Sequence, residues 1–490
     1  MKLTRNIKRL ATVGLAVILC AGLFGGCTPK AATAKLDPKN PTTITIWHYY
    51  SGSVMNAFNE MLREFNDTVG IEKGIIVEGE SYGSISELRN AVLDSAKGAV
   101  GSKELPDIFA AYADLAVSLE SYDVLTDLSE YVTDEERNEY IISYWDEGRV
   151  GANDTLRIFP IAKSTEVLLL NETDWAPFAA ATGLTVADLT TMEGIARVGK
   201  AYYEWTDAKT PDVPDDGAAF WGRDSISNLF VIGCKQLGVE IFGAQNGKAV
   251  LNPDKTAIRR IWDNYYIPYI RGYFSAQGQF RSEGVRVGEI LAYVGSTASA
   301  GYFPTEVTTD VGTYAVESVV LPAPVFEGAE QVMVQQGAGM VVPKAAEEEM
   351  YASIVFLKWA TDIEPNTLFA AKSGYMPVKR AANDITQFMN IIEGNDVATD
   401  DMAFKTLEAV FGTIQQSEMY TPKAFDGATN ARAVLDSALT TAATAGRDAV
   451  LASLAEGQSL DEAAAPWSTD EVFDAWYNEL TAALYAAAGQ

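Results

Sequence analysis

The sequence predicts an α/β protein with mostly parallel sheets, and three observations lead to this fold class. The chain has 490 residues and is 48% hydrophobic, which is enough to bury more than one core. Between residues 43 and 110, apolar alternation typical of strands gives way repeatedly to apolar spacing typical of helices. Strands that alternate with helices are the pattern of parallel sheets joined by crossover helices.

The first elements follow one another closely along the chain. Residues 43–47 alternate as a half-buried strand does, and residues 53–66 carry apolar side chains on one helical face. The expected order is strand 43–47, helix 53–66, strand 74–78, helix 84–97 and strand 107–110.

Later elements are expected at wider intervals. The middle third, residues 175–302, is rich in helical patterns, and the last hundred residues are largely alanine-rich helix. Further strands are expected at residues 157–160, 167–171, 290–294, 319–321 and 339–342, and further helices at 346–361 and 470–487.

The first 26 residues have the anatomy of a secretory signal peptide. Four basic residues precede an uncharged apolar run at 11–24, which is too short for a stable membrane-spanning helix. Residues 23–27 resemble a bacterial lipobox, with Phe24 where leucine is commonest, so Cys27 is the expected lipidation site. Residues 27–40, with several prolines, are expected to be a lipid-anchored tether.

Composition excludes several classes of function. The net charge of −29 disfavours nucleic acid as a partner. One histidine, His48, and one cysteine in the expected folded body, Cys234, cannot supply a zinc site and make a nucleophilic triad improbable. We therefore expect no metal, no cofactor and no catalytic residues, although 66 acidic residues leave a glycosidase carboxylate pair formally open.

Ligands of open parallel sheets bind beyond the carboxyl ends of the strands. Polar and aromatic side chains follow each of the first three expected strands: His48 and Tyr49, then Tyr82, then Tyr112 and Asp114. The sequence therefore predicts a binding site at this edge.

Taken in order, several short motifs resemble the extracellular solute-binding proteins of ABC transporters, in particular the carbohydrate-binding group that includes maltose-binding proteins. The motifs lie at residues 44–47, 106–108, 159–162, 236–238, 288–289, 321–324, 336–339 and 373–378. The resemblance implies a two-lobed periplasmic-binding-protein-like fold of type II, with a hinge between lobes. Mapped here, lobe 1 would hold residues 41–157 and 322–372, and lobe 2 residues 158–321 and 373–490.

The resemblance also implies that the protein captures a sugar, expected to be an oligosaccharide, and delivers it to transporter permeases. The protein is then expected to be a monomeric, non-catalytic lipoprotein anchored to the bacterial cell membrane. Sugar sites combine aromatic plates with planar polar groups. The strand-end rule and the resemblance together nominate fourteen ligand-binding residues: Trp47, His48, Tyr49, Tyr82, Tyr112, Asp114, Trp221, Arg223, Asp224, Tyr293, Ser296, Gln335, Gln336 and Tyr375.

Each nominated residue also has a structural interpretation: Trp47 as core, for example, or Tyr112 and Asp114 as a helix-capping corner. Other solutes remain open, namely a polyamine, a peptide or a glycerol phosphate ester. A phosphate ligand is disfavoured because only Arg223 among the fourteen carries a fixed positive charge. Two further alternatives are a surface-anchored glycoside hydrolase and a sensor or adhesin with a degenerate cleft.

Overall fold

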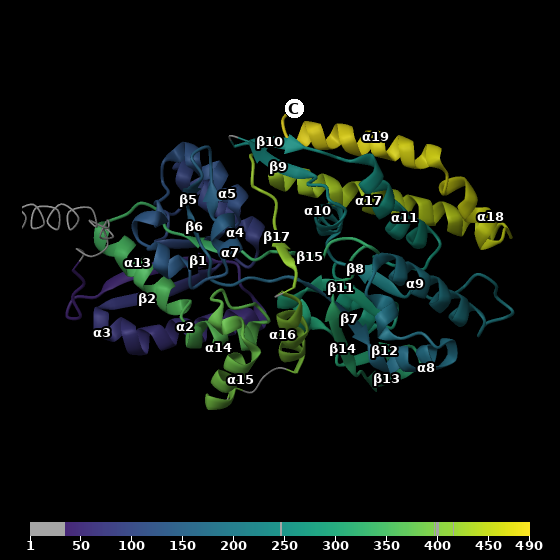
Figure 1. The fold of residues 1–490 in the computed structure, drawn as a ribbon, viewed down its shortest axis with the longest axis horizontal. Coiled ribbons are helices and arrows are strands. Elements are labelled where there is room, and N and C mark those ends of the chain that lie inside the picture. The colour runs from purple at the N-terminus through teal and green to yellow at the C-terminus, as the bar shows by residue number, and fades with distance from the viewer. Residues whose placement is uncertain (1–34, 246, 396, 398–400, 415) are drawn as a thin grey trace, which may run out of the picture.

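The structure, a computed structural model, describes residues 35–490 except 246, 396, 398–400 and 415. The expected signal peptide, the lipidation site at Cys27 and the start of the tether lie outside the described residues. Among the helices described, none is both long enough and apolar enough to span a bilayer. The described chain folds into two α/β lobes, one on each side of Figure 1.

The first sheet lies in the first lobe and has the strand order β2-β1-β3-β16-β6. Four of its strands run in one direction, and β16 runs against its neighbours β3 and β6. The strands are β1 (Thr42–His48), β2 (Ile75–Ser81), β3 (Ile108–Ala111), β6 (Ile158–Phe159) and β16 (Gly339–Val341).

Helices cover this sheet and close the first core. Its elements include α2 (Gly52–Phe65), α4 (Ile85–Lys97), α5 (Ala113–Leu119), α7 (Ile142–Glu147), α13 (Glu347–Ala360) and α14 (Ile363–Ser373). Helix α4 begins where the Ser84 side chain accepts a hydrogen bond from the Glu87 amide at 3.2 Å, a common N-cap. Leu88 and Val92 on its inner face are fully buried.

The second sheet has the order β14-β7-β11-β8, and here β7 alone runs against the other three strands. The strands are β7 (Glu166–Asn171), β8 (Trp221–Arg223), β11 (Ala292–Ser296) and β14 (Ser318–Pro322). Strand β7 is buried along its whole length, which fits a continuous apolar run in the middle of a covered sheet.

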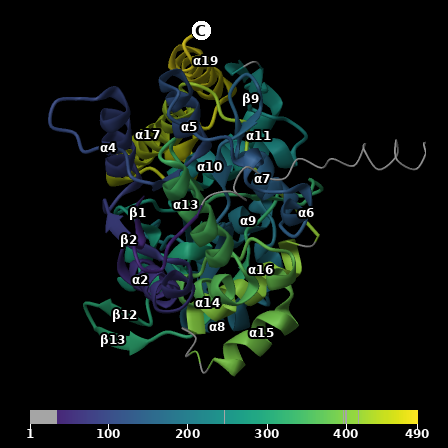
Figure 2. The same cartoon turned by 90° about the vertical axis from the view of Figure 1, so that its left-hand side faces the viewer.

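The second core lies between this sheet and a set of long helices. They are α8 (Glu172–Thr182), α9 (Met192–Asp207), α10 (Ile226–Gln236), α11 (Lys255–Ile270), α17 (Ala428–Ala455) and α19 (Asp470–Ala487). Helices α15 (Ile385–Gly394) and α16 (Asp401–Ile414) pack with α14 and β14 on the other side. Figure 2 shows the hairpin of β12 (Glu306–Thr309) and β13 (Gly312–Ala315) projecting at one corner.

Three segments cross between the lobes side by side. Lys163 pairs with Met376 through two backbone hydrogen bonds, and Ser164 pairs with Gln336 in the same way. The crossing segment that contains Gln336 turns at Gly337, whose φ is +101°. A Cβ there would lie 3.0 Å from the Ala162 carbonyl oxygen, so only glycine fits without strain. This crossing comes later in the chain than residue 322, where the sequence suggested the lobe limit.

Candidate ligand-binding cleft

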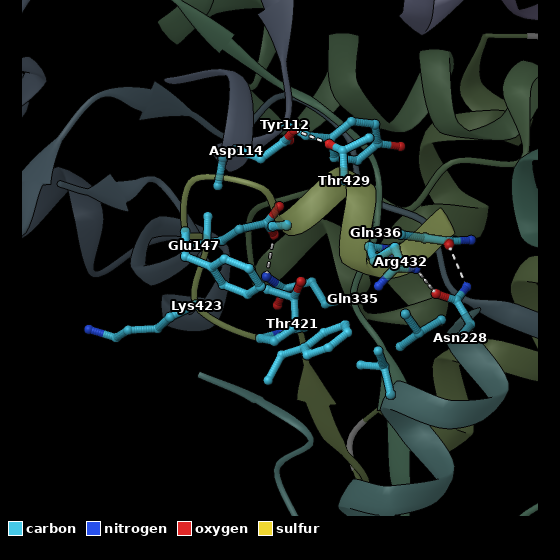
Figure 3. A pocket seen from close by; sticks show the side chains of 18 of the residues that line it. Tyr112, Asp114, Glu147, Asn228, Gln335, Gln336, Thr421, Lys423, Thr429 and Arg432 are labelled. Atoms are coloured by element: carbon cyan, nitrogen blue, oxygen red, sulfur yellow. Dashed lines mark hydrogen bonds between the residues drawn. The ribbon is translucent and has the colours of Figure 1, made fainter. Parts of the chain in front are cut away.

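A cavity of about 630 Å³ lies between the lobes. The first lobe contributes side chains from α4, α5 and α7, and the second contributes side chains from α10 and α17 (Figure 3). Strands β15 (Val332–Val334) and β17 (Glu418–Tyr420) pair in parallel and carry the segments that complete the wall. In Figure 1, β17 and the coil that follows it pass between the two lobes.

Four aromatic side chains line the cleft: Tyr112, Phe242, Tyr420 and Phe425. Tyr112 follows β3 and stands at the N-cap position of α5, so the carboxyl end of a parallel strand aims it at the cleft. Tyr420 pairs with Val334 in the β15–β17 register. Rings therefore reach the cavity from both lobes.

A buried ion pair fixes the carboxylate of Glu147 at the cleft. Glu147 Oε2 lies 2.7 Å from Lys163 Nζ and accepts a second hydrogen bond from Gln335 Nε2 at 2.6 Å. Lys163 Nζ also donates to the Gly337 carbonyl at 2.9 Å. Since Lys163 and Gly337 belong to crossing segments, the carboxylate is tied directly to the hinge.

Asp114 connects the two lobes across the cleft. Its Oδ2 pairs with Arg89 Nη1 of α4 at 2.6 Å and accepts a hydrogen bond from the Thr429 hydroxyl of α17. Asp114 and Thr429 lie together at one end of the cavity in Figure 3. The sequence interpretation of Asp114 as part of a helix-capping corner is compatible with this position, in the first turn of α5.

Arg432 comes from the first turns of α17 and faces the cleft from the second lobe. Its Nη2 donates to the Ser227 hydroxyl at 3.2 Å and to the Asn228 side-chain oxygen. Asn228 Nδ2 in turn donates to Gln336 Oε1 at 3.2 Å. Burial lowers the pKa of Arg432, but a guanidinium stays protonated at neutral pH.

Of the fourteen nominated residues, four line the cavity: Tyr112, Asp114, Gln335 and Gln336. Tyr49 and Tyr375 lie next to this group, with their hydroxyls 3.4 Å apart. Burial raises the pKa of both phenols, so each stays a neutral hydroxyl.

The other residues nominated from the first lobe lie in or beside its core. Trp47 is buried and its ring centroid lies 4.9 Å from that of half-buried Tyr82. His48 is 1% exposed and packs against Tyr50 and Phe58. Burial lowers the His48 pKa to about 4, so the ring is neutral at physiological pH.

The residues nominated from the second lobe also serve its fold. Trp221 and Tyr293 are buried in separate clusters of that lobe, and Arg223 pairs with buried Glu166. The Asp224 side chain accepts the Arg281 amide at 2.9 Å. Ser296 accepts the Ala298 amide at 3.3 Å, as an N-cap does.

Sequence reasoning missed several residues that line the cleft. They are chiefly Arg89, Glu147, Asn228, Tyr420, Phe425 and Arg432. Tyr420 and Phe425 flank Pro422 just before an alanine-rich helix, and this break in composition was the available signal. Nothing local marks Arg432, which reaches the cleft only because α17 packs on α10.

The cleft does not look like a metal site. Across the described part of the chain, no group of three or more His, Cys, Asp or Glu side chains is arranged to hold a metal ion. Two of the cleft carboxylates have cationic partners: Lys163 for Glu147, and Arg89 for Asp114.

Comparisons with known proteins agree on one family. The model of the family described as bacterial extracellular solute-binding protein matches residues 56–406. A search of curated protein sequences finds no significant match.

Solved structures share the fold at low sequence identity. The cyclic α-maltosyl-1,6-maltose binding protein from Arthrobacter globiformis is 16% identical, with 91% of this chain and 100% of that one covered and a TM-score of 0.61. UgpB from Mycobacterium tuberculosis, in complex with glycerophosphocholine, is 17% identical over 91% and 99%, with a TM-score of 0.62. The maltose/maltodextrin-binding domain MalE from Bdellovibrio bacteriovorus, bound to maltotriose, is 14% identical over 90% and 100%, with a TM-score of 0.59.

Proposed function

Because this chain belongs to the family of bacterial extracellular solute-binding proteins, we propose that it captures an oligosaccharide in the interlobe cleft and delivers it to the permease of an ABC transporter. The cleft itself carries the proposal, since its walls come from both lobes and combine four aromatic rings with amide and carboxylate groups. A volume of about 630 Å³ falls in the range of small-molecule sites.

The chemistry of the walls suits a sugar. Tyr112, Tyr420 and Phe425 offer flat faces to the C–H surfaces of pyranose rings, while Gln335, Gln336 and Asn228 offer planar hydrogen-bonding groups to hydroxyls. Structural neighbours named for cyclic maltosyl-maltose and maltotriose support the choice of ligand class.

The same proposal includes the setting of the protein. We propose that residues 1–26 are removed on export, that Cys27 is lipidated, and that residues 27–40 tether a monomeric, non-catalytic protein to the cell membrane. The three crossing segments would act as the hinge on which the lobes close.

A glycerol phosphate ester is the second candidate. It is favoured by Arg432, a fixed positive charge in the cleft, and by the neighbour solved with glycerophosphocholine. The sequence argument against phosphate considered Arg223 alone, which the structure pairs with Glu166.

The test is a thermal-shift screen of the purified protein against neutral and acidic oligosaccharides and glycerophosphodiesters, followed by calorimetry. We expect at least one saccharide to raise the melting temperature, because a ligand that binds only the folded state stabilises it. Tyr112→Ala and Tyr420→Ala should each weaken this binding at least tenfold, while Tyr485→Ala, an exposed tyrosine on α19, should leave it unchanged. Stabilisation by phosphodiesters alone would move the assignment to the second candidate, and release of shorter sugars would contradict the non-catalytic role.

A further inference from the structure

Four carboxylates line the cleft, and three of them, all but Asp146, have partners described here. Glu147 pairs with Lys163 and Asp114 with Arg89. Asp436 Oδ1 accepts the Ser227 amide in the first turn of α10 at 2.6 Å, where the helix dipole also compensates a negative charge.

Most of the cationic side chains that line the cleft also have an oxygen partner from the protein. Arg89 has Asp114, and Lys423 has Asp154 at 3.3 Å. Arg149 donates to the Asp154 carbonyl oxygen at 3.3 Å. Arg89 and Lys423 are therefore matched by carboxylates, whereas Arg149 has a neutral acceptor.

Arg432 differs from Arg89 and Lys423 in having no carboxylate partner in the described part of the chain, and from Arg149 in being withdrawn from water. Across the described residues no carboxylate lies within 4.0 Å of its guanidinium, which is held by the neutral oxygens of Ser227 and Asn228. Both of these hydrogen bonds use Nη2, so the other edge of the planar group is available on the cleft side. A guanidinium edge with two N–H groups in line matches the two oxygens of a carboxylate or phosphate.

The surroundings make a counter-ion favourable at this position. Withdrawal from water lowers the pKa of the Arg432 guanidinium, and the nearby charges of Asp436, Glu166 and Asp114 oppose this shift only in part. The two hydrogen-bond acceptors of Arg432 are neutral and also compensate its charge only in part. An anionic group on the ligand would compensate the remaining positive charge of Arg432. The nearby side-chain amide of Gln336, which is hydrogen-bonded to Asn228, would help to orient that anionic group.

We propose that Arg432 forms an anion subsite, so that the preferred solute carries a carboxylate or phosphate group seated on the wall formed by α10 and α17. The inference rests on the proposed function, since it assigns an anionic group of the ligand to one end of the same cleft. It names the ligand class more narrowly: an acidic saccharide such as a uronic-acid oligomer, or a sugar phosphate or glycerol phosphate.

The test compares anionic probes with neutral counterparts, with the full chain and at constant ionic strength. The pairs are trigalacturonate with its methyl ester and glycerol 3-phosphate with glycerol, and inorganic phosphate is tested separately against chloride as the background anion. Melting temperatures are measured first, and affinities by calorimetry where a shift appears. We expect the charged member of at least one pair to bind about 10- to 100-fold tighter, as for a hydrogen-bonded charge pair.

Variants then locate the effect. Arg432→Met should abolish the preference for the charged member, and Arg432→Lys, which keeps the charge but not the planar fork, should retain part of it. Arg197→Met, an exposed arginine on α9 that pairs with Glu327, makes the same charge change elsewhere and should bind like the parent protein. Because Arg432→Met also removes the hydrogen bonds to Ser227 and Asn228, its melting temperature without ligand is the reference against which its ligand-induced shifts are measured.

The outcomes separate the two proposals. Tight binding of neutral saccharides with no charge preference would overturn the anion subsite and leave sugar capture standing. Binding of glycerol 3-phosphate through Arg432, with no response to any saccharide, would support the subsite and overturn sugar capture. If no anionic probe, including inorganic phosphate, stabilises the parent protein more than Arg432→Met, the subsite does not exist.

Discussion

Replacing Lys163 by Met should destabilise the protein strongly, because it removes the cation that pairs with the buried carboxylate of Glu147. The two side chains are 2% and 9% exposed, and Lys163 also serves the Gly337 carbonyl. Breaking a buried pair from one side costs about 3 to 5 kcal/mol. With the slight exposure of Glu147, we expect about 3 kcal/mol.

The assay is urea unfolding together with calorimetric melting. If a lobe of roughly half the chain unfolds as a unit, its unfolding entropy is about 0.5 kcal/mol/K, so the midpoint should fall by about 6 °C. The double variant Lys163→Met, Glu147→Gln should recover about 2 kcal/mol of the loss, since no charge is then stranded. A shift below about 1 °C in the single variant, or simple additivity in the double one, would refute the reasoning.

Three further outcomes follow from other sites. His48 has a folded-state pKa of about 4 against about 6.5 when unfolded; stability should therefore be full above pH 6.5 and fall by about 3 kcal/mol as the pH drops to 4, a loss that urea titrations should find reduced in His48→Asn. Gly337→Ala should cost about 2 kcal/mol in the same assay, more than Gly328→Ala, where φ is also positive but no atom lies within 4 Å; equal costs would contradict the close approach at the hinge. Burial raises the pKa of the Cys234 thiol to about 12, so peptide mapping should find it unalkylated by iodoacetamide until urea unfolds the chain, and rapid labelling of native protein would contradict its burial.

Much of the fold could be predicted from the sequence because the two periodicities are clear where elements are amphipathic. The strand expected at residues 43–47 is β1 (Thr42–His48), and the helix expected at 84–97 is α4 (Ile85–Lys97). The two-lobed α/β architecture is confirmed, but the sheets are mixed, because β16 pairs antiparallel with both its neighbours in the first sheet and β7 does so in the second. Strand directions within each lobe could not be predicted, because strands such as β16 return from distant parts of the chain.

The cleft was less accessible to sequence reasoning. The strand-end rule found Tyr112 because it follows a buried strand directly. The rule cannot distinguish a side chain that faces the cleft from one that turns into the core. Trp221 is an example of the second kind, because it is fully buried on β8. Arg432 and Phe425 lie far along the chain from the strands they approach, so only tertiary packing brings them to the ligand.

Strand β16 has a consequence for the order in which the protein can form. It occupies the position between β3 and β6, although residues 339–341 are synthesised long after residue 159. Until they emerge from the ribosome, β3 and β6 expose unpaired backbone edges, and such edges invite wrong pairing. The nascent N-terminal half therefore needs protection by chaperones or by an unfolded, export-ready state, and ligand can bind only when nearly the whole polypeptide has been made.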